Sequence, residues 1–100
     1  MIRKTTPTHT WTLSIPVDTI SKIEAYYSVN KKLVLKKRTE DFALNDNTAT
    51  VKLTSKETLL FPNDSFVDVQ LFVKTVDGEV IGTTVQKVYC AECLCDEVIE

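Results

Sequence analysis

The segment that decides the fold is Asp64–Tyr89, which reads DSFVDVQLFVKTVDGEVIGTTVQKVY. Its first half alternates with a period of two, which predicts a strand with one buried face. The apolar face carries Val67, Val69, Leu71 and Val73, and the opposite face carries Asp68, Gln70, Phe72 and Lys74. Asp77-Gly78 follows, and both residue types tolerate the positive φ that a tight hairpin turn requires. We therefore predict a hairpin in which residues 79–89 return antiparallel to the first strand.

The composition is that of a single soluble globular domain. The chain has 100 residues, of which 43% are hydrophobic and 26% charged, with a formal net charge of -2. The one basic cluster is interpreted as a solvated strand and turn, with Lys36 and Arg38 on one face and Lys37 on the other, so no nucleic-acid partner is expected. Only two glycines occur, Gly78 and Gly82, which excludes a phosphate-binding P-loop and a dinucleotide-binding glycine motif.

The sequence also predicts no membrane-spanning segment and no signal peptide. No apolar run approaches the roughly 20 residues that cross a bilayer, so no membrane partner is expected. Residues 1–7 are positively charged without an apolar stretch behind them, which is not a signal-peptide pattern. Three cysteines crowded at one end suit a reducing compartment better than a disulfide scaffold. We expect a protein made and kept in a cytoplasm, or packaged from one.

Further strands are predicted along the chain, at residues 10–15, 20–29, 33–38 and 48–54, with a brief extended piece at 42–44. Residues 19–25 can also be read as a short helix, but the Tyr-Tyr-Ser-Val ending favours a strand. Residues 5–12 suit an extended edge segment broken by Pro7, and Trp11 is expected to anchor the core. Residues 55–61 resemble a short capped helical turn.

These segments predict an all-β fold. Six or seven short strands, with a turn signal about every ten residues, indicate an antiparallel β-sandwich that is immunoglobulin-like but has no disulfide; a small barrel is the alternative. The predicted organisation is one domain over residues 1–89, with an extended N-terminal segment 1–9, followed by a cysteine-containing tail over residues 90–100.

Cys90, Cys93 and Cys95 form the one pattern with chemical potential. Zinc takes four sulfur or nitrogen ligands, and His9 is the only imidazole available as a fourth. Alternatively, Cys90 and Cys93 form a redox-type Cys-x-x-Cys pair, although the strand-to-helix setting that lowers a thiol pKa is missing. The third interpretation, which we adopt, is that the thiols are ordinary residues of a terminal strand and tail. No metal or cofactor is predicted.

Nothing in the chain predicts catalysis. His9 has no neighbouring nucleophile and no orienting acid, as a catalytic triad would require. The carboxylate pairs Glu40-Asp41 and Asp96-Glu97 lie in turn or tail contexts. We predict that the protein is not an enzyme.

Two aromatic residues point instead to binding. Tyr26 and Phe72 fall on the polar faces of their predicted strands. Exposed aromatic side chains of this kind form either a sugar-stacking platform or a protein interface, unless a turn, the tail or a sheet neighbour covers them.

Three stretches resemble a known family when taken together and in order. They are MIRKTTPTHTWTL (residues 1–13), VKLTSKETLLF (51–61) and VDVQLFVKTVDG (67–78). They resemble a family of small uncharacterised proteins encoded in tailed bacteriophages and prophages of Firmicutes, and the general pattern is similar to the immunoglobulin-like N-terminal domain of phage baseplate upper proteins. The resemblance extends to Tyr89 and does not include the cysteines.

This resemblance implies a non-enzymatic component of the phage particle, assembled in the bacterial cytoplasm, whose partners are other phage structural proteins and other copies of itself. The component can belong to the tail or baseplate, the neck or the head decoration. Thr8 and Thr10 are interface candidates, because an open strand edge offers unpaired backbone groups to a neighbour. The extended N-terminus is expected to reach across to another subunit. The alternative function is a carbohydrate-binding module that uses Tyr26 and Phe72.

Overall fold

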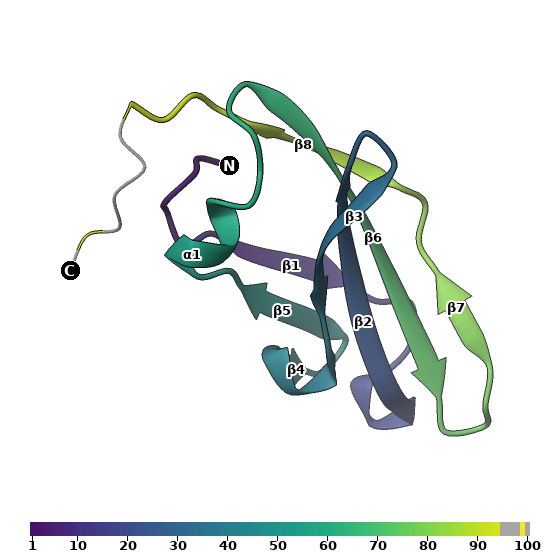
Figure 1. The fold of residues 1–100 in the computed structure, drawn as a ribbon. Coiled ribbons are helices and arrows are strands. Elements are labelled where there is room, and N and C mark those ends of the chain that lie inside the picture. Colours follow the sequence, from purple (N-terminus) through teal and green to yellow (C-terminus); the bar gives the residue numbers. More distant parts are fainter. Residues whose placement is uncertain (95–98, 100) are drawn as a thin grey trace.

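Two antiparallel sheets pack face to face in the computed structural model, which describes residues 1–94 and residue 99 (Figure 1). The smaller sheet has three strands, in the order β1 (Thr8–Thr12), β5 (Thr48–Lys52) and β4 (Phe42–Asn45). Its strands run across the direction of β2 (Ile20–Val29) and β6 (Ser65–Thr75), the two central strands of the larger sheet. The predicted all-β antiparallel sandwich is confirmed.

The larger sheet is built around β6. On one side β6 pairs with β2, which in turn pairs with β3 (Lys32–Lys37). On its other side, β6 pairs with β7 (Val80–Gly82) over one half of its length and with β8 (Gln86–Cys90) over the other half. Residues 79–89 therefore return antiparallel to β6, as predicted, but as two strands.

The break between β7 and β8 explains why the described chain has eight strands and not six or seven. Thr83 N–H donates to the carbonyl of Leu71, at 2.9 Å, but Leu71 N–H donates to the side-chain hydroxyl of Thr83, at 3.0 Å. A side-chain oxygen thus takes the place of a backbone carbonyl, and the regular ladder stops there. The turn before β7 is the predicted one, with Gly78 at φ +89°.

Short helical turns make the crossings between strands. Two are 3-10 turns, Val17–Thr19 and Thr39–Asp41, and the third is α1 (Ser55–Thr58), which confirms the predicted helical turn. A reciprocal capping box starts α1: Glu57 N–H donates to the Thr54 hydroxyl at 3.1 Å, and Thr54 N–H donates to the Glu57 carboxylate at 2.8 Å. No helix in the described part of the chain is long and apolar enough to cross a membrane.

The core lies between the two sheets and follows the predicted alternation of β6 and β2. The fully or almost fully buried apolar side chains are Ile23, Ala25, Tyr27, Ala49, Val51, Leu53, Phe61, Val67, Val69, Leu71, Val73 and Cys90. Trp11, predicted as a core anchor, is only partly buried. It packs against the buried core cluster, and its indole N–H donates to Gln86 Oε1 at 3.2 Å.

The two ends of the domain differ from the prediction. Residues 1–9 are not one extended segment, because the chain turns at Arg3 and Lys4, where Lys4 has φ +74°. The Met1 ammonium donates to the carbonyl of Tyr89 at 2.8 Å, and Ala91 N–H donates to the carbonyl of Met1 at 2.7 Å. The N-terminus is thus held beside its own β8. Cys90, assigned to the tail, is a fully buried residue of β8, so the domain extends past residue 89.

Lys37 corrects the interpretation of the basic cluster as solvated. Its side chain is 8% exposed and points to the inner side of β3, opposite Ala25. The ammonium lies 2.6 and 2.7 Å from the two carboxylate oxygens of Glu57 on α1. The same glutamate therefore caps α1 and neutralises a buried lysine.

Candidate functional site

The outer side of the larger sheet, opposite the core, carries four of the eight Phe, Tyr and Trp side chains of the chain. We call it the outer face. It is formed by the alternate residues of β2, β6, β7 and β8 that point away from the core, and its aromatic members are Tyr26, Phe66, Phe72 and Tyr89. Large hydrophobic side chains rarely gather on an exposed sheet face without a binding role.

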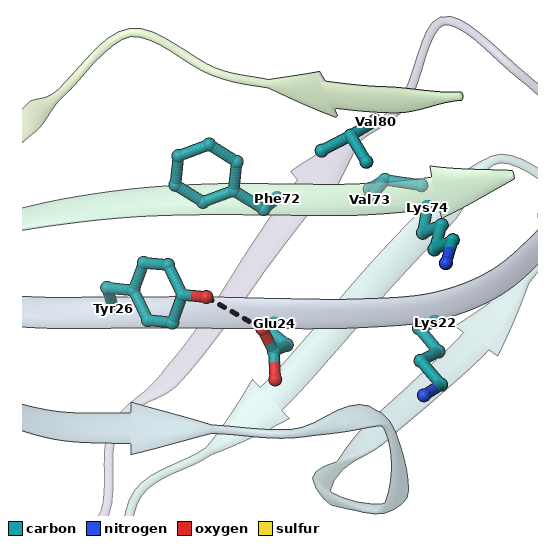
Figure 2. A pocket seen from close by; sticks show the side chains of 7 residues that line it. All are labelled: Lys22, Glu24, Tyr26, Phe72, Val73, Lys74 and Val80. Carbon is teal, nitrogen blue, oxygen red and sulfur yellow. Dashed lines mark hydrogen bonds between the residues drawn. The ribbon is translucent and has the colours of Figure 1, made fainter. Parts of the chain in front are cut away.

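Tyr26 and Phe72, the two predicted interface residues, lie side by side. They come from neighbouring strands, and their ring centroids are 5.3 Å apart at an interplanar angle of 45°. Such tilted pairs are favoured over face-to-face stacking. The rings border a hollow of about 380 Å³, which is also lined by Lys22, Glu24, Val73, Lys74 and Val80 (Figure 2).

Charged groups hold Tyr26 in place. Its hydroxyl donates to Glu24 Oε1 at 2.7 Å, the contact drawn in Figure 2, and the Lys36 ammonium lies 3.2 Å from Glu24 Oε2. The hydrogen bond from Tyr26 and the charge and hydrogen bond of Lys36 keep the pKa of Glu24 below its ordinary value. The same hydrogen bond raises the pKa of Tyr26. Lys36 also lies 5.5 Å from the centroid of the Tyr26 ring, within the range of a cation–π contact.

Phe72 rests on the backbone of β7. Gly82 is its direct partner, and a Cβ placed on Gly82 would lie only 2.7 Å from Cε1 of the ring. The glycine therefore leaves room for the ring to lie against the sheet. Both predicted residues are half-buried by their own neighbours, so sheet neighbours cover them in part.

A second aromatic pair was not predicted. Phe66 and Tyr89 are direct cross-strand partners with ring centroids 5.4 Å apart, and they are 59% and 44% exposed. The Tyr89 hydroxyl is hydrogen-bonded to Asp64. Phe66 and Phe72 both occupy even-numbered positions of β6. Extending the predicted alternation by one residue, from Val67 back to Phe66, would have identified Phe66 as a member of the same face. An ion pair between Lys87 and Asp68, at 3.0 Å, lies next to this pair.

Thr8 and Thr10 belong to a different surface. Both are exposed residues of β1, an edge strand of the smaller sheet, and the Thr10 hydroxyl lies 3.2 Å from that of Thr50 on β5. The structure therefore does not bring the two threonines together with Tyr26 and Phe72. They belong to an edge of the smaller sheet.

The metal-ligand candidates named from the sequence form no cluster of three or more within the described residues. Burial raises the pKa of the Cys90 thiol, and Cys93 N–H donates to Asn63 Oδ1 at 3.0 Å. His9 Nδ1 lies 2.7 Å from the Tyr27 hydroxyl, and burial together with the N-terminal charge lowers the pKa of His9. Cys95 lies outside the described residues. Within residues 1–94 and 99, the His, Cys, Asp and Glu side chains form no group of three or more that could hold a metal ion.

Comparison with family models, with curated proteins and with solved structures finds no match for this chain. The phage resemblance and the immunoglobulin-like character of the sandwich therefore stay predictions.

Proposed function

We propose that this chain is a non-enzymatic structural protein of a phage particle, assembled in the bacterial cytoplasm, which acts through protein–protein contacts. The observation that carries the proposal is the outer face with its two aromatic pairs, Tyr26–Phe72 and Phe66–Tyr89. The resemblance of residues 1–13, 51–61 and 67–78 to small phage proteins supports the setting, and an immunoglobulin-like domain of a tail, neck or head component would fit it.

The chemistry of the outer face suits a protein partner. Interface cores are enriched in aromatic residues and depleted of unpaired charge. On this face, the carboxylates of Glu24 and Asp68 are already paired with Lys36 and Lys87. A partner can therefore cover the aromatic rings without leaving these two carboxylates unpaired.

A carbohydrate-binding module is the second candidate. The hollow beside Tyr26 and Phe72, of about 380 Å³, lies within the size range of small-molecule sites and has Lys22, Glu24 and Lys74 as polar groups. Sugar stacking needs a free ring face, however. Phe72 rests against Gly82, and Lys36 lies near the ring of Tyr26. These contacts favour the protein interface.

Light scattering over a concentration series tests the proposal. We expect a discrete oligomer for the unaltered chain, and weaker association for Phe66→Ser at the same melting temperature, because Phe66 is 59% exposed and lies outside the core. Val76→Ser is the matched control, since Val76 is 65% exposed but lies in the β6–β7 turn.

A glycan screen completes the test. A strict monomer that binds a glycan, and loses it on Tyr26→Ala, would overturn the proposal in favour of the carbohydrate-binding module. A monomer that binds no glycan would remove self-association from the proposed function.

A further inference from the structure

Open strand edges are the places where another chain can extend a sheet, because their peptide N–H and C=O groups have no partner. The smaller sheet has the edges β1 and β4, and the larger sheet has β3 on one side and β7 with β8 on the other. Proteins usually protect such edges with charge, short length or irregularity. The four edges of this domain differ sharply in this respect.

Three of the edges are protected. β3 carries lysines at positions 32, 36 and 37, and its pairing with β2 shifts register between Tyr27 and Ser28. β4 has only four residues. The edge made of β7 and β8 is interrupted at residues 83–85, and beyond β8 the chain is already bridged by Ile2.

β1 has neither charge nor irregularity, and it is one residue longer than β4. Its five residues, Thr-His-Thr-Trp-Thr, include no lysine, arginine, aspartate or glutamate, and its register with β5 is regular from Thr8 to Thr12. Of the edges in the described chain, β1 is the one best suited to accept another strand.

The hydrogen-bond pattern shows which peptide groups of β1 are available. Leu53 N–H donates to the carbonyl of Pro7 at 3.0 Å, and Leu13 N–H donates to the carbonyl of Asn47 at 2.6 Å. Residues of an antiparallel strand alternate between their two neighbours. The odd-numbered positions from 7 to 13 thus bond toward β5, and Thr8, Thr10 and Thr12 direct their peptide groups to the open side.

We propose that two copies of this chain join through antiparallel pairing of their β1 strands around a two-fold axis at Thr10. Thr10 then faces Thr10 of the second copy, and Thr8 faces its Thr12. Each of the three hydrogen-bonded pairs exchanges two N–H···O bonds, about six in all. The two smaller sheets become one continuous six-stranded sheet, in which the two β1 strands meet at the axis and β5 and β4 of each copy follow outward.

The sequence of β1 identifies a second copy as the partner strand. Threonine occupies both ends and the centre of Thr8–Thr12, so a reversed copy places threonine opposite threonine at each hydrogen-bonded pair. Threonine pairs across strands are favourable, and the Thr10–Thr50 contact already begins such a row. In a symmetric contact, residue 10 of one copy also faces residue 10 of the other. A charged residue at this position would therefore repel its counterpart.

A hollow lies beside β1, on its side toward β8. Its volume is about 250 Å³, and it is bounded by Thr8, Trp11, Val69, Gln86 and Val88. On the inner side of β1, His9 would face Trp11 of the second copy. The two rings are already 6.4 Å apart in an edge-to-face arrangement within one chain.

Amide hydrogen exchange combined with sedimentation tests this contact. The inference rests on the proposed function in one respect, because it says how two copies of the chain meet. We expect a dimer whose Thr8, Thr10 and Thr12 amides exchange more slowly as concentration rises. Thr10→Pro removes the two central N–H donors and should raise the dimer Kd by about tenfold or more. Proline is tolerated on the open side of an edge strand, so the domain should still fold.

Thr10→Lys is the second variant, and Thr50→Lys its matched control. Both place a lysine on the same face of the smaller sheet, but Thr50 is on the central strand β5 and does not meet its own copy. We expect Thr10→Lys to weaken the dimer and Thr50→Lys to leave it intact.

The outcomes separate this inference from the proposed function. A dimer that survives Thr10→Pro but dissociates with Phe66→Ser would overturn edge pairing and leave the outer face as the contact. Unchanged exchange at the three threonine amides at all concentrations would overturn it as well, as would a strict monomer. Loss of the dimer in both Thr10 variants, with the dimer retained in Phe66→Ser even where larger assemblies are lost, supports edge pairing.

Discussion

Phe72 lies so close over Gly82 that a single methyl group on the glycine would meet the ring at 2.7 Å. Glycine weakens the interior of a strand, because it has no side chain to pack and much backbone entropy to lose. Here an aromatic ring from the neighbouring strand covers the glycine, an arrangement that also stabilises designed sheets. The position of Phe72, and with it the Tyr26–Phe72 pair, depends on this absent side chain.

Gly82→Ala is therefore expected to displace the Phe72 ring and separate it from Tyr26. The ring can rotate away, so the loss of stability should be at the low end of the range for overpacking, about 1 kcal/mol. NMR contacts between the Tyr26 and Phe72 rings measure the displacement. Gly78→Ala is the control: it meets open space but has φ +89°, so it should cost about 1 kcal/mol without moving the rings. Unchanged ring contacts in Gly82→Ala would contradict the packing described.

The ion pair between Lys37 and Glu57 yields a second prediction. Glu57→Gln leaves a nearly buried ammonium without its counter-charge, which should destabilise the domain by about 3 kcal/mol in urea unfolding. Lys37→Met removes the buried charge and keeps the volume, while Glu57 can still cap α1. The loss of stability in Lys37→Met should be clearly smaller than in Glu57→Gln. Equal losses for both variants would show that the pair has no special role.

The same glutamate predicts a fall of stability in acid. Burial raises the pKa of Glu57, but the hydrogen bonds from Lys37 and Thr54 and the charge of Lys37 outweigh it, so the pKa lies below its ordinary 4.5. The unfolded chain binds the proton first as pH falls, so the stabilisation is complete above about 4.5 and is lost as pH drops through the lower, folded-state pKa. Unfolding free energies between pH 3 and pH 7 measure it. Glu57→Gln should flatten the curve, and an equally steep curve would contradict the assignment.

Cys90 and Cys93 should respond differently to serine. Cys90→Ser places a hydroxyl in an apolar core position that is 0% exposed, and should cost about 2 kcal/mol. Cys93→Ser, at a half-buried position after β8, should stay within about 0.5 kcal/mol. Thermal unfolding compares them, and metal analysis of the purified protein tests the zinc alternative. Stoichiometric zinc that is lost on Cys93→Ser would revive the metal site.

The features predicted well are those that depend on neighbouring residues in the chain. The alternation from Val67 to Val73 predicted which face of β6 is buried, and Asp77-Gly78 predicted the turn. A serine or threonine followed by an acidic residue and leucines in residues 55–61 predicted a capped turn, although Thr54, which caps α1, was assigned to the preceding strand. The same alternation placed Tyr26 and Phe72 away from the core, although it did not show that they touch, because register between strands is not a local property.

The features missed depend on contacts between distant segments. The break between β7 and β8 rests on a bond from Leu71 to the Thr83 hydroxyl, and the burial of Lys37 rests on Glu57. The N-terminus is held by β8 at the other end of the sequence. No pattern within one segment contains these pairings.

The sequence by itself determined the strand pattern, the turns and the apolar faces, because a period of two and a positive φ are properties of a few adjacent residues. The tertiary structure decided the rest: which aromatic rings meet on the outer face, and which strand edge stays open. Those depend on strand order and register, which are set only when the whole core packs at once.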